Sequence, residues 1–110
     1  MIQNLLIKLK AGEANFSDVI AHIEAHYTHT ATAFRNGQHH NAASENQGSA
    51  KVFSFAKLND LNKEQTLDLF AEHYLAVLET PEATDHQNIR QFMIHGWNGI
   101  EFEGIALTAK

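Results

Sequence analysis

The sequence predicts an α+β fold, mainly α-helical, with three to four helices and a small antiparallel sheet. Apolar residues recur at helical spacing in several segments, whereas residues 100–103 alternate between apolar and acidic side chains as a half-buried strand does. The chain has 110 residues, 44% of them hydrophobic, which is enough for one hydrophobic core without cross-links. We therefore treat residues 1–110 as a single domain, with an all-α fold as the alternative.

Two helices are predicted near the start of the chain. Residues 2–10 lack the basic region and cleavage site of a secretory signal and are too short to span a membrane, which leaves a packed helix or, alternatively, a weakly bound membrane-surface helix. Asn15 followed by Asp18 is typical of an N-cap with a carboxylate one turn later. A helix ending near residue 27 or 28 follows, with the apolar stripe Phe16, Val19, Ile20, Ile23 and Tyr27.

The next segments have weaker patterns. Residues 29–48 lose helical periodicity, and the Asn36-Gly37 pair predicts a turn, with a hairpin as one interpretation. An irregular segment of this length is unusual in so small a domain, so it is expected to be either functional or mobile. Residues 50–58 fit both a strand and a helix, and we favour a helix with Ser49 as its cap.

The best-specified helix comes next. Asn62 and Gln65 form a capping-box pattern, and Pro81 predicts the end of the helix. Its apolar stripe consists of Leu67, Phe70, Ala71, Tyr74, Val77 and Leu78. A second box at Thr84 and Gln87 predicts another helix, for which Gly96 would be the left-handed C-cap.

A turn and a short strand are predicted after this last helix. Residues 97–99 turn the chain, and the strand at 100–103 is expected to pair near Phe102 with residues 31–35 around Phe34. The predicted core consists of Phe16, Ile20, Ile23, Phe55, Leu67, Phe70, Tyr74, Val77, Ile89, Phe92 and Trp97.

Composition excludes several functions. The net charge of −5 argues against a nucleic-acid partner, which clustered Lys and Arg would bind. With 0 Cys, the chain has no thiol nucleophile, disulfide or thiolate zinc site. Ser49 and Ser54 lack a nucleophile motif, and Gly48-Ser49 is not a glycine-rich phosphate loop.

Histidine is abundant, with eight residues, and invites a metal hypothesis. His22 and His26 lie one helical turn apart, and His29 would be a third ligand, but the segment does not match the zinc-protease pattern. We therefore expect no metal and no other cofactor. Protonation of the histidines would offset the negative net charge, which predicts solubility or partner affinity that depends on pH.

The densest polar cluster is residues 85–90, which open the last predicted helix. Free backbone N–H groups and the helix dipole favour an anionic ligand there. The alternative is structural, with residues 84–87 capping the helix and Arg90 paired to a carboxylate such as Glu79. Nearby Trp97 is expected to cover the core or the sheet rather than to anchor a partner. The candidate ligand or partner site is Asp85, His86, Asn88, Arg90 and Trp97.

Four strings resemble, in order, the HopJ type III effector family of proteobacterial proteins: YTHTATAFRNG at 27–37, NQGSAKVFSFAKL at 46–58, TLDLFAEHYLAVL at 66–78 and DHQNIRQFMIHGWNGIEF at 85–102. The resemblance covers roughly residues 15–104. It implies a small bacterial domain of unestablished biochemical activity. Some relatives are classed as effectors delivered into plant cells by a type III secretion apparatus.

The chain departs from the family pattern at several positions. Ala50 replaces a common cysteine, so a cysteine nucleophile or redox switch would be absent here. Ala31 replaces a proline, His29 an aromatic residue and Leu75 an arginine, whereas residues 85–90 match throughout. Type III signals are typically rich in serine, but residues 2–10 contain none. We therefore expect a cytoplasmic protein, with secretion into a host cell as the alternative.

Two functions are compatible with these observations. The preferred one is a non-enzymatic interaction domain whose polar helix start and Trp97 region bind a protein or a small anionic ligand, with no nucleic acid or membrane partner. The alternative is a small enzyme that uses Asp85, His86 and a tyrosine, Tyr27 or Tyr74, in acid–base work. An enzyme would need a concave pocket in which Asp85 or His86 faces a second titratable group, and we predict that no such pocket exists.

Overall fold

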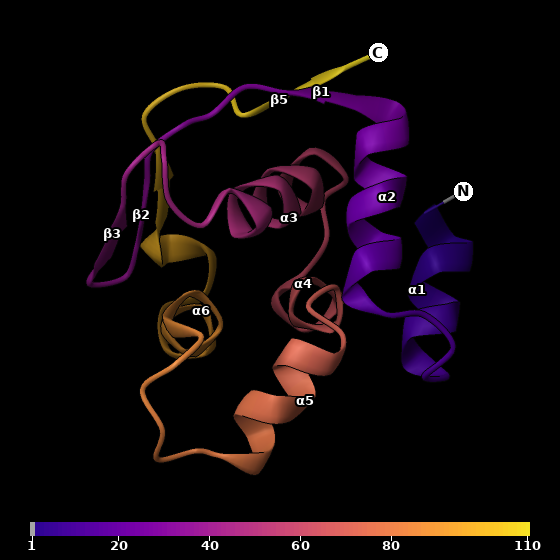
Figure 1. Ribbon diagram of the computed structural model, residues 1–110, viewed down its shortest axis with the longest axis vertical. Helices are drawn as coiled ribbons and strands as arrows, with labels where there is room; N and C mark the ends of the chain where they lie inside the picture. The colour runs from indigo at the N-terminus through magenta and orange to yellow at the C-terminus, as the bar shows by residue number, and fades with distance from the viewer. Residues whose placement is uncertain (1) are drawn as a thin grey trace.

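Figure 1 shows the computed structural model, which describes residues 2–110. Its elements are α1 Ile2–Lys10, α2 Phe16–His26, β1 Tyr27–His29, β2 Phe34–Asn36, β3 His39–Asn41, α3 Gln47–Leu58, α4 Lys63–Asp68, α5 Glu72–Glu79, α6 Gln87–His95, the 3-10 turn η1 Gly96–Gly99, β4 Ile100–Phe102 and β5 Leu107–Ala109. The predicted α+β class is confirmed, but these residues form six α-helices rather than three to four. None of the described helices is long and apolar enough to cross a membrane.

The helix count differs partly because the predicted helix up to Leu78 is broken. Its apolar stripe is continuous, yet α4 ends at Asp68 and α5 begins only at Glu72. Ala71 between them has φ 50° and ψ −121°, a backbone conformation that favours glycine. The spacing of apolar residues does not reveal such a break, because Leu67 and Phe70 before it and Val77 after it all lie in one core.

Replacement of Ala71 by glycine is expected to stabilise the protein by roughly 1 kcal/mol, because glycine relieves the strained conformation. Denaturant unfolding measures this gain. Ala21 is the matched control, since it is an exposed residue inside α2. Ala21→Gly is expected to cost about 0.5–1 kcal/mol, so a loss of stability in both variants would contradict a strained Ala71.

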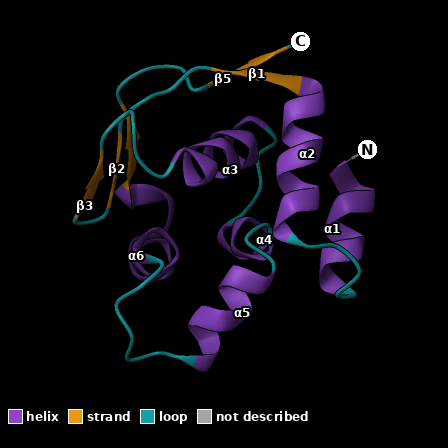
Figure 2. Ribbon diagram, in the orientation of Figure 1, coloured by secondary structure: helices purple, strands orange, loops and turns teal. Residues whose placement is uncertain are grey.

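Two small antiparallel sheets accompany the helices (Figure 2). In the three-stranded sheet β3-β2-β4, Phe34 lies opposite Phe102, as predicted. β2 and β3 form the hairpin suggested by Asn36-Gly37, in which Asn36 pairs with His39 and Gly37 has φ +60°. The second sheet, β1-β5, was not predicted and joins the end of α2 to the C-terminal residues. Seven of the residues 29–48, which were expected to be irregular, are therefore strand.

The helix caps follow the sequence patterns at two starts only. The capping boxes of α2, at Asn15 and Asp18, and of α4, at Asn62 and Gln65, are both present.

The caps expected for α3 and α6 are wrong. Ser49 lies inside α3, and the box at Thr84 and Gln87 is absent because the N-cap of α6 is His86. Gly96 does end α6 with positive φ, but its ψ of −153° lies outside the left-handed helical region.

The helices share one core built around aromatic rings. Phe53 is fully buried, and its ring centroid lies 5.0 Å from Phe92, 5.4 Å from Phe70 and 6.1 Å from Phe34. Of the predicted core, seven residues are buried: Ile23, Phe55, Leu67, Phe70, Val77, Ile89 and Phe92. The other four, Phe16, Ile20, Tyr74 and Trp97, pack partly buried against it. The prediction omitted Phe34 and Phe53.

Candidate functional site

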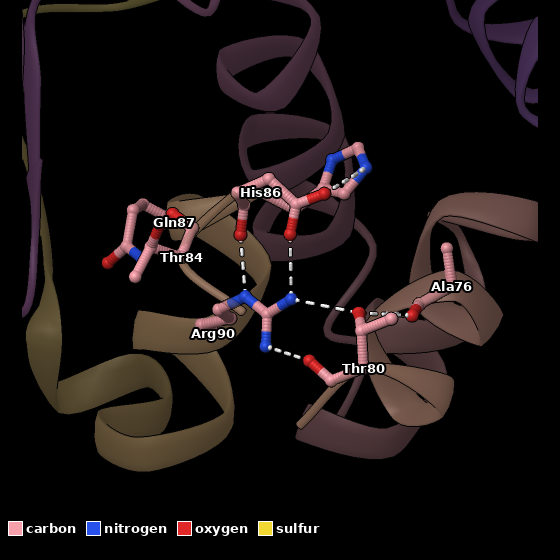
Figure 3. A network of polar contacts seen from close by, with 7 residues as sticks. Ala76, Thr80, Thr84, His86, Gln87 and Arg90 are labelled. Carbon is pink, nitrogen blue, oxygen red and sulfur yellow. Dashed lines mark hydrogen bonds and ion pairs between the residues drawn. The ribbon is translucent and has the colours of Figure 1, made fainter. Parts of the chain in front are cut away.

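Arg90 holds the loop between α5 and α6 in place (Figure 3). Its Nε donates to the Asp85 carbonyl oxygen at 2.6 Å, and one terminal nitrogen donates to Asp85 Oδ1 at 2.8 Å. The guanidinium also donates to Thr80 O at 2.9 Å and Thr80 Oγ1 at 3.2 Å. The Arg90 side chain is only 11% exposed, so its donors serve the fold. Arg90 pairs with a carboxylate, as the structural alternative predicted, but the partner is Asp85 rather than Glu79.

The ion pair between Arg90 and Asp85 is expected to make the stability of the protein depend on pH. The hydrogen bond from Arg90 lowers the pKa of the Asp85 carboxyl. A carboxyl with a lowered pKa in the folded state stabilises the fold above its unfolded pKa, and this contribution disappears as the pH falls below about 4. Asp85→Asn is therefore expected to destabilise the protein at pH 7 and to have a smaller effect at pH 3. Urea unfolding at both pH values tests this, and a pH-independent difference would contradict it.

Asn88 belongs to a network of asparagines, of which Asn36, Asn41 and Asn88 itself are buried. It exchanges two hydrogen bonds with Asn41: Asn41 Nδ2 donates to Asn88 Oδ1 at 3.1 Å, and Asn88 Nδ2 donates to Asn41 Oδ1 at 3.0 Å. Asn36 Nδ2 donates to the Asn88 carbonyl oxygen at 2.7 Å, and Asn46 Nδ2 donates to Asn41 Oδ1 at 2.7 Å. Asn41 Oδ1 on β3 therefore accepts hydrogen bonds from both Asn46 and Asn88, and so links the start of α3 to the start of α6.

These two helix starts line a cleft of about 460 Å³ together with three histidines. His86 comes from the start of α6, His73 from α5 and His39 from β3. The rings of His73 and His86 lie 5.2 Å apart, centroid to centroid, and are tilted by 37°. The rest of the lining is Phe16, Asn46, Gly48, Ser49, Phe70, Gln87, Asn88 and Ile89.

The N-termini of α3 and α6 lack the usual side-chain caps. Their N-cap residues Asn46 and His86 both have φ 51°, and neither side chain bonds to the first turn. Among residues 2–110, the backbone N–H groups of 47–49 and of 87–88 have no hydrogen-bond acceptor. Uncapped N–H groups at helix starts favour a negatively charged group.

The chain is similar to a known protein family over nearly its whole length. The HopJ type III effector protein family matches residues 2–107 of the chain. The chain belongs to this family. The match extends beyond the 15–104 segment expected from sequence strings, since it includes α1 and reaches the first residue of β5.

A solved structure supports the assignment. The crystal structure of unknown function protein VPA0580 is 48% identical to this HopJ-family chain and superposes with a TM-score of 0.92. The similarity covers 100% of this chain and 94% of the other. No curated protein matches the chain.

The HopJ-family structure separates the residues of the predicted site. His86 and Asn88 line the cleft. Asp85 and Arg90 do not, and their ion pair instead holds the loop between α5 and α6. Trp97 Nε1 donates to the Leu61 carbonyl oxygen at 3.1 Å, and its ring packs on Phe92, so Trp97 covers the core.

Sequence reasoning missed His39 and His73 as members of this group. They are far from His86 in the chain, and no spacing pattern connects them.

The prediction that no concave pocket would hold His86 opposite a second titratable group is wrong, because His73 faces it in the cleft. The tyrosines of the enzyme hypothesis are not part of this arrangement. Tyr27 accepts a hydrogen bond from Asn59, and Tyr74 does not line the cleft. Asp85 Oδ2 lies 3.9 Å from His86 Nε2, beyond hydrogen-bond distance.

The histidines considered as metal ligands are used in other ways. His29 Nε2 lies 3.0 Å from Gln47 Oε1, where a hydrogen bond links β1 to α3. His22 and His26 lie with their rings 4.5 Å apart, and burial together with the neighbouring His26 lowers the pKa of His22. Within residues 2–110, no three His, Cys, Asp or Glu side chains converge as a metal site would require.

Proposed function

We propose that this HopJ-family protein is a non-enzymatic binding domain that holds a small ligand with an anionic group. The observation that carries the proposal is that His39, His73 and His86 line one cleft together with two uncapped helix starts. Its volume of about 460 Å³ falls in the range of small-molecule sites. The cleft contains neither Lys nor Arg, so imidazole and backbone N–H groups would supply the donors.

The other wall of the cleft indicates the rest of the ligand. Phe16, Phe70 and Ile89 line it, and the rings of Phe16 and Phe70 lie stacked with their centroids 6.0 Å apart. The rings of Phe16 and His73 also pack edge to face, with their centroids 4.9 Å apart. An apolar wall beside polar donors suits a ligand with an aromatic or aliphatic body and an acidic head.

Calorimetric titration with phenyl phosphate and with inorganic phosphate tests this proposal. We expect phenyl phosphate to bind more tightly, because only its ring gains contacts with the apolar wall. His73→Gln and His86→Asn are expected to weaken phenyl phosphate binding about tenfold, equivalent to about 1.4 kcal/mol. Asparagine suits position 86 because it tolerates the positive φ of this N-cap.

His40→Gln is the matched control. His40 is the neighbour of His39 on β3, is exposed, and lies 3.2 Å from Glu103 outside the cleft lining. Its replacement is expected to leave phenyl phosphate binding unchanged. Absence of binding at millimolar ligand, or equal losses in all three histidine variants, would contradict the proposed site.

An acid–base enzyme is the second candidate, favoured by the His73 and His86 rings that face each other. The same titration distinguishes the two functions when released phosphate is also measured. Binding without release supports a binding domain, whereas release that is lost in both His73→Gln and His86→Asn supports an enzyme.

We also propose the bacterial cytoplasm as the place of action. Residues 2–10 serve the fold, since Leu5 of α1 is buried and Lys10 lies 3.7 Å from Asp68 of α4. The name of the family, type III effector, keeps delivery into a host cell as the alternative.

A further inference from the structure

A second hollow lies between α5 and α6, with a lining different in character from the histidine cleft. This groove of about 330 Å³ is lined mainly by apolar side chains: Val77, Leu78, Pro81, Met93 and Ile94. Leu78 is 48% exposed and Ile94 69%. Leu75, one turn before Leu78 on α5, is 60% exposed and extends the apolar surface. Contiguous exposed apolar residues of this kind mark interaction sites more often than isolated ones do.

Three charged residues lie in or next to the lining of the groove: Arg90, Glu79 and Glu82. Gln87, Arg90 and Gln91 complete the lining, and Arg90 is the one charged side chain in it. The charge of Arg90 is already neutralised by Asp85, 2.8 Å away. Glu79 and Glu82 are exposed beside Leu78 and Pro81, and within residues 2–110 neither has an ion-pair partner. The groove is therefore apolar with a negative edge.

We propose that this groove is a docking surface for a short amphipathic helix of a partner protein, with leucine-like side chains on one face and Lys or Arg at its flanks. Grooves between helices commonly bind the apolar face of such a helix, and complementary charges fix its orientation. α5 has 8 residues, about 12 Å of helix, so the groove admits two or three apolar side chains spaced at i, i+3 and i+7. The four hydrogen bonds of Arg90 hold the connecting loop, so the groove is formed before binding.

Fluorescence anisotropy with two synthetic peptides tests this proposal. Both carry leucines at i, i+3 and i+7, but one has lysines at its flanks and the other glutamates. We expect the lysine peptide to bind at least about tenfold more tightly and to lose affinity as salt is added. Ile94→Ser is expected to abolish binding, because it removes the most exposed apolar contact of the groove.

Two further variants make the test specific. Ile105 is 77% exposed but lies outside the groove, so Ile105→Ser is expected to leave peptide binding unchanged. The double variant Glu79→Lys with Glu82→Lys is expected to reverse the preference toward the glutamate peptide. Phenyl phosphate binding in Ile94→Ser should equal that of the wild type, which separates this surface from the histidine cleft.

Three outcomes would overturn the proposal. They are equal binding of both peptides, equal losses in Ile94→Ser and Ile105→Ser, and a preference for lysine that survives the double charge reversal. Sedimentation analysis adds a fourth, because self-association that Ile94→Ser prevents would assign the groove to a second copy of the chain.

Discussion

Replacement of Phe53 by alanine is expected to lower the free energy of unfolding by about 3–5 kcal/mol. Phe53 is fully buried in α3 and packs against rings from four other parts of the chain: Phe34, Phe70, Phe92 and Trp97. Removal of its ring leaves a cavity between the sheet, the α4–α5 break and α6, which cannot all move inward together. Because domains of this size are stable by only about 5–15 kcal/mol, much of the total would be lost.

Leu58→Ala is the control for this measurement. Leu58 lies at the end of the same helix but is 56% exposed, so its replacement is expected to change stability by about 0.5 kcal/mol or less. Urea unfolding of both variants gives the comparison. A loss below about 1 kcal/mol for Phe53→Ala would show that the aromatic cluster is not the centre of the core.

The asparagine network is expected to give the second largest effect. Asn41→Ala and Asn88→Ala should each cost about 1–3 kcal/mol, because each leaves buried amide groups of the other residue without a partner. The double variant should lose less stability than the sum of the two single losses, since the second replacement removes groups that the first has already left without a hydrogen-bond partner. A double-mutant cycle by urea unfolding measures this coupling, expected at about 0.5–3 kcal/mol.

Asn98→Ala controls for the loss of an exposed asparagine and is expected to be close to neutral. Strict additivity of Asn41→Ala and Asn88→Ala would contradict a shared network. Because the network joins the starts of α3 and α6, phenyl phosphate affinity should also fall in Asn41→Ala, although Asn41 does not line the cleft.

Local patterns predicted much of this fold. The capping boxes at Asn15 and Asn62 depend on residues three positions apart, and both are present. The pairing of Phe34 with Phe102 could be predicted because one amphipathic strand needs a partner. Ala71, which has a positive φ, could not be recognised as a break, because alanine has the highest helix propensity of all residues.

The site was less predictable than the fold. Sequence reasoning found the segment 85–90, but it could not distinguish Arg90, which holds a loop, from His86, which lines the cleft. The partners of these residues come from distant segments, as with Asn36 and Asn88 or His39 and His86. A hydrogen-bonding side chain has the same sequence signature whether its partner is a ligand or the backbone, so only the three-dimensional arrangement assigns the roles.

The sheet formed by β1 and β5 has a kinetic consequence. It pairs Tyr27 with Ala109, and the Lys110 N–H donates to the His26 carbonyl oxygen, so the last residues complete a structure begun in the first quarter of the chain. Pairings between residues so distant in sequence carry a large loop-closure entropy and form late in folding. During synthesis on the ribosome, α2 and α3 can form early, but this closure must wait until residues 107–110 have emerged.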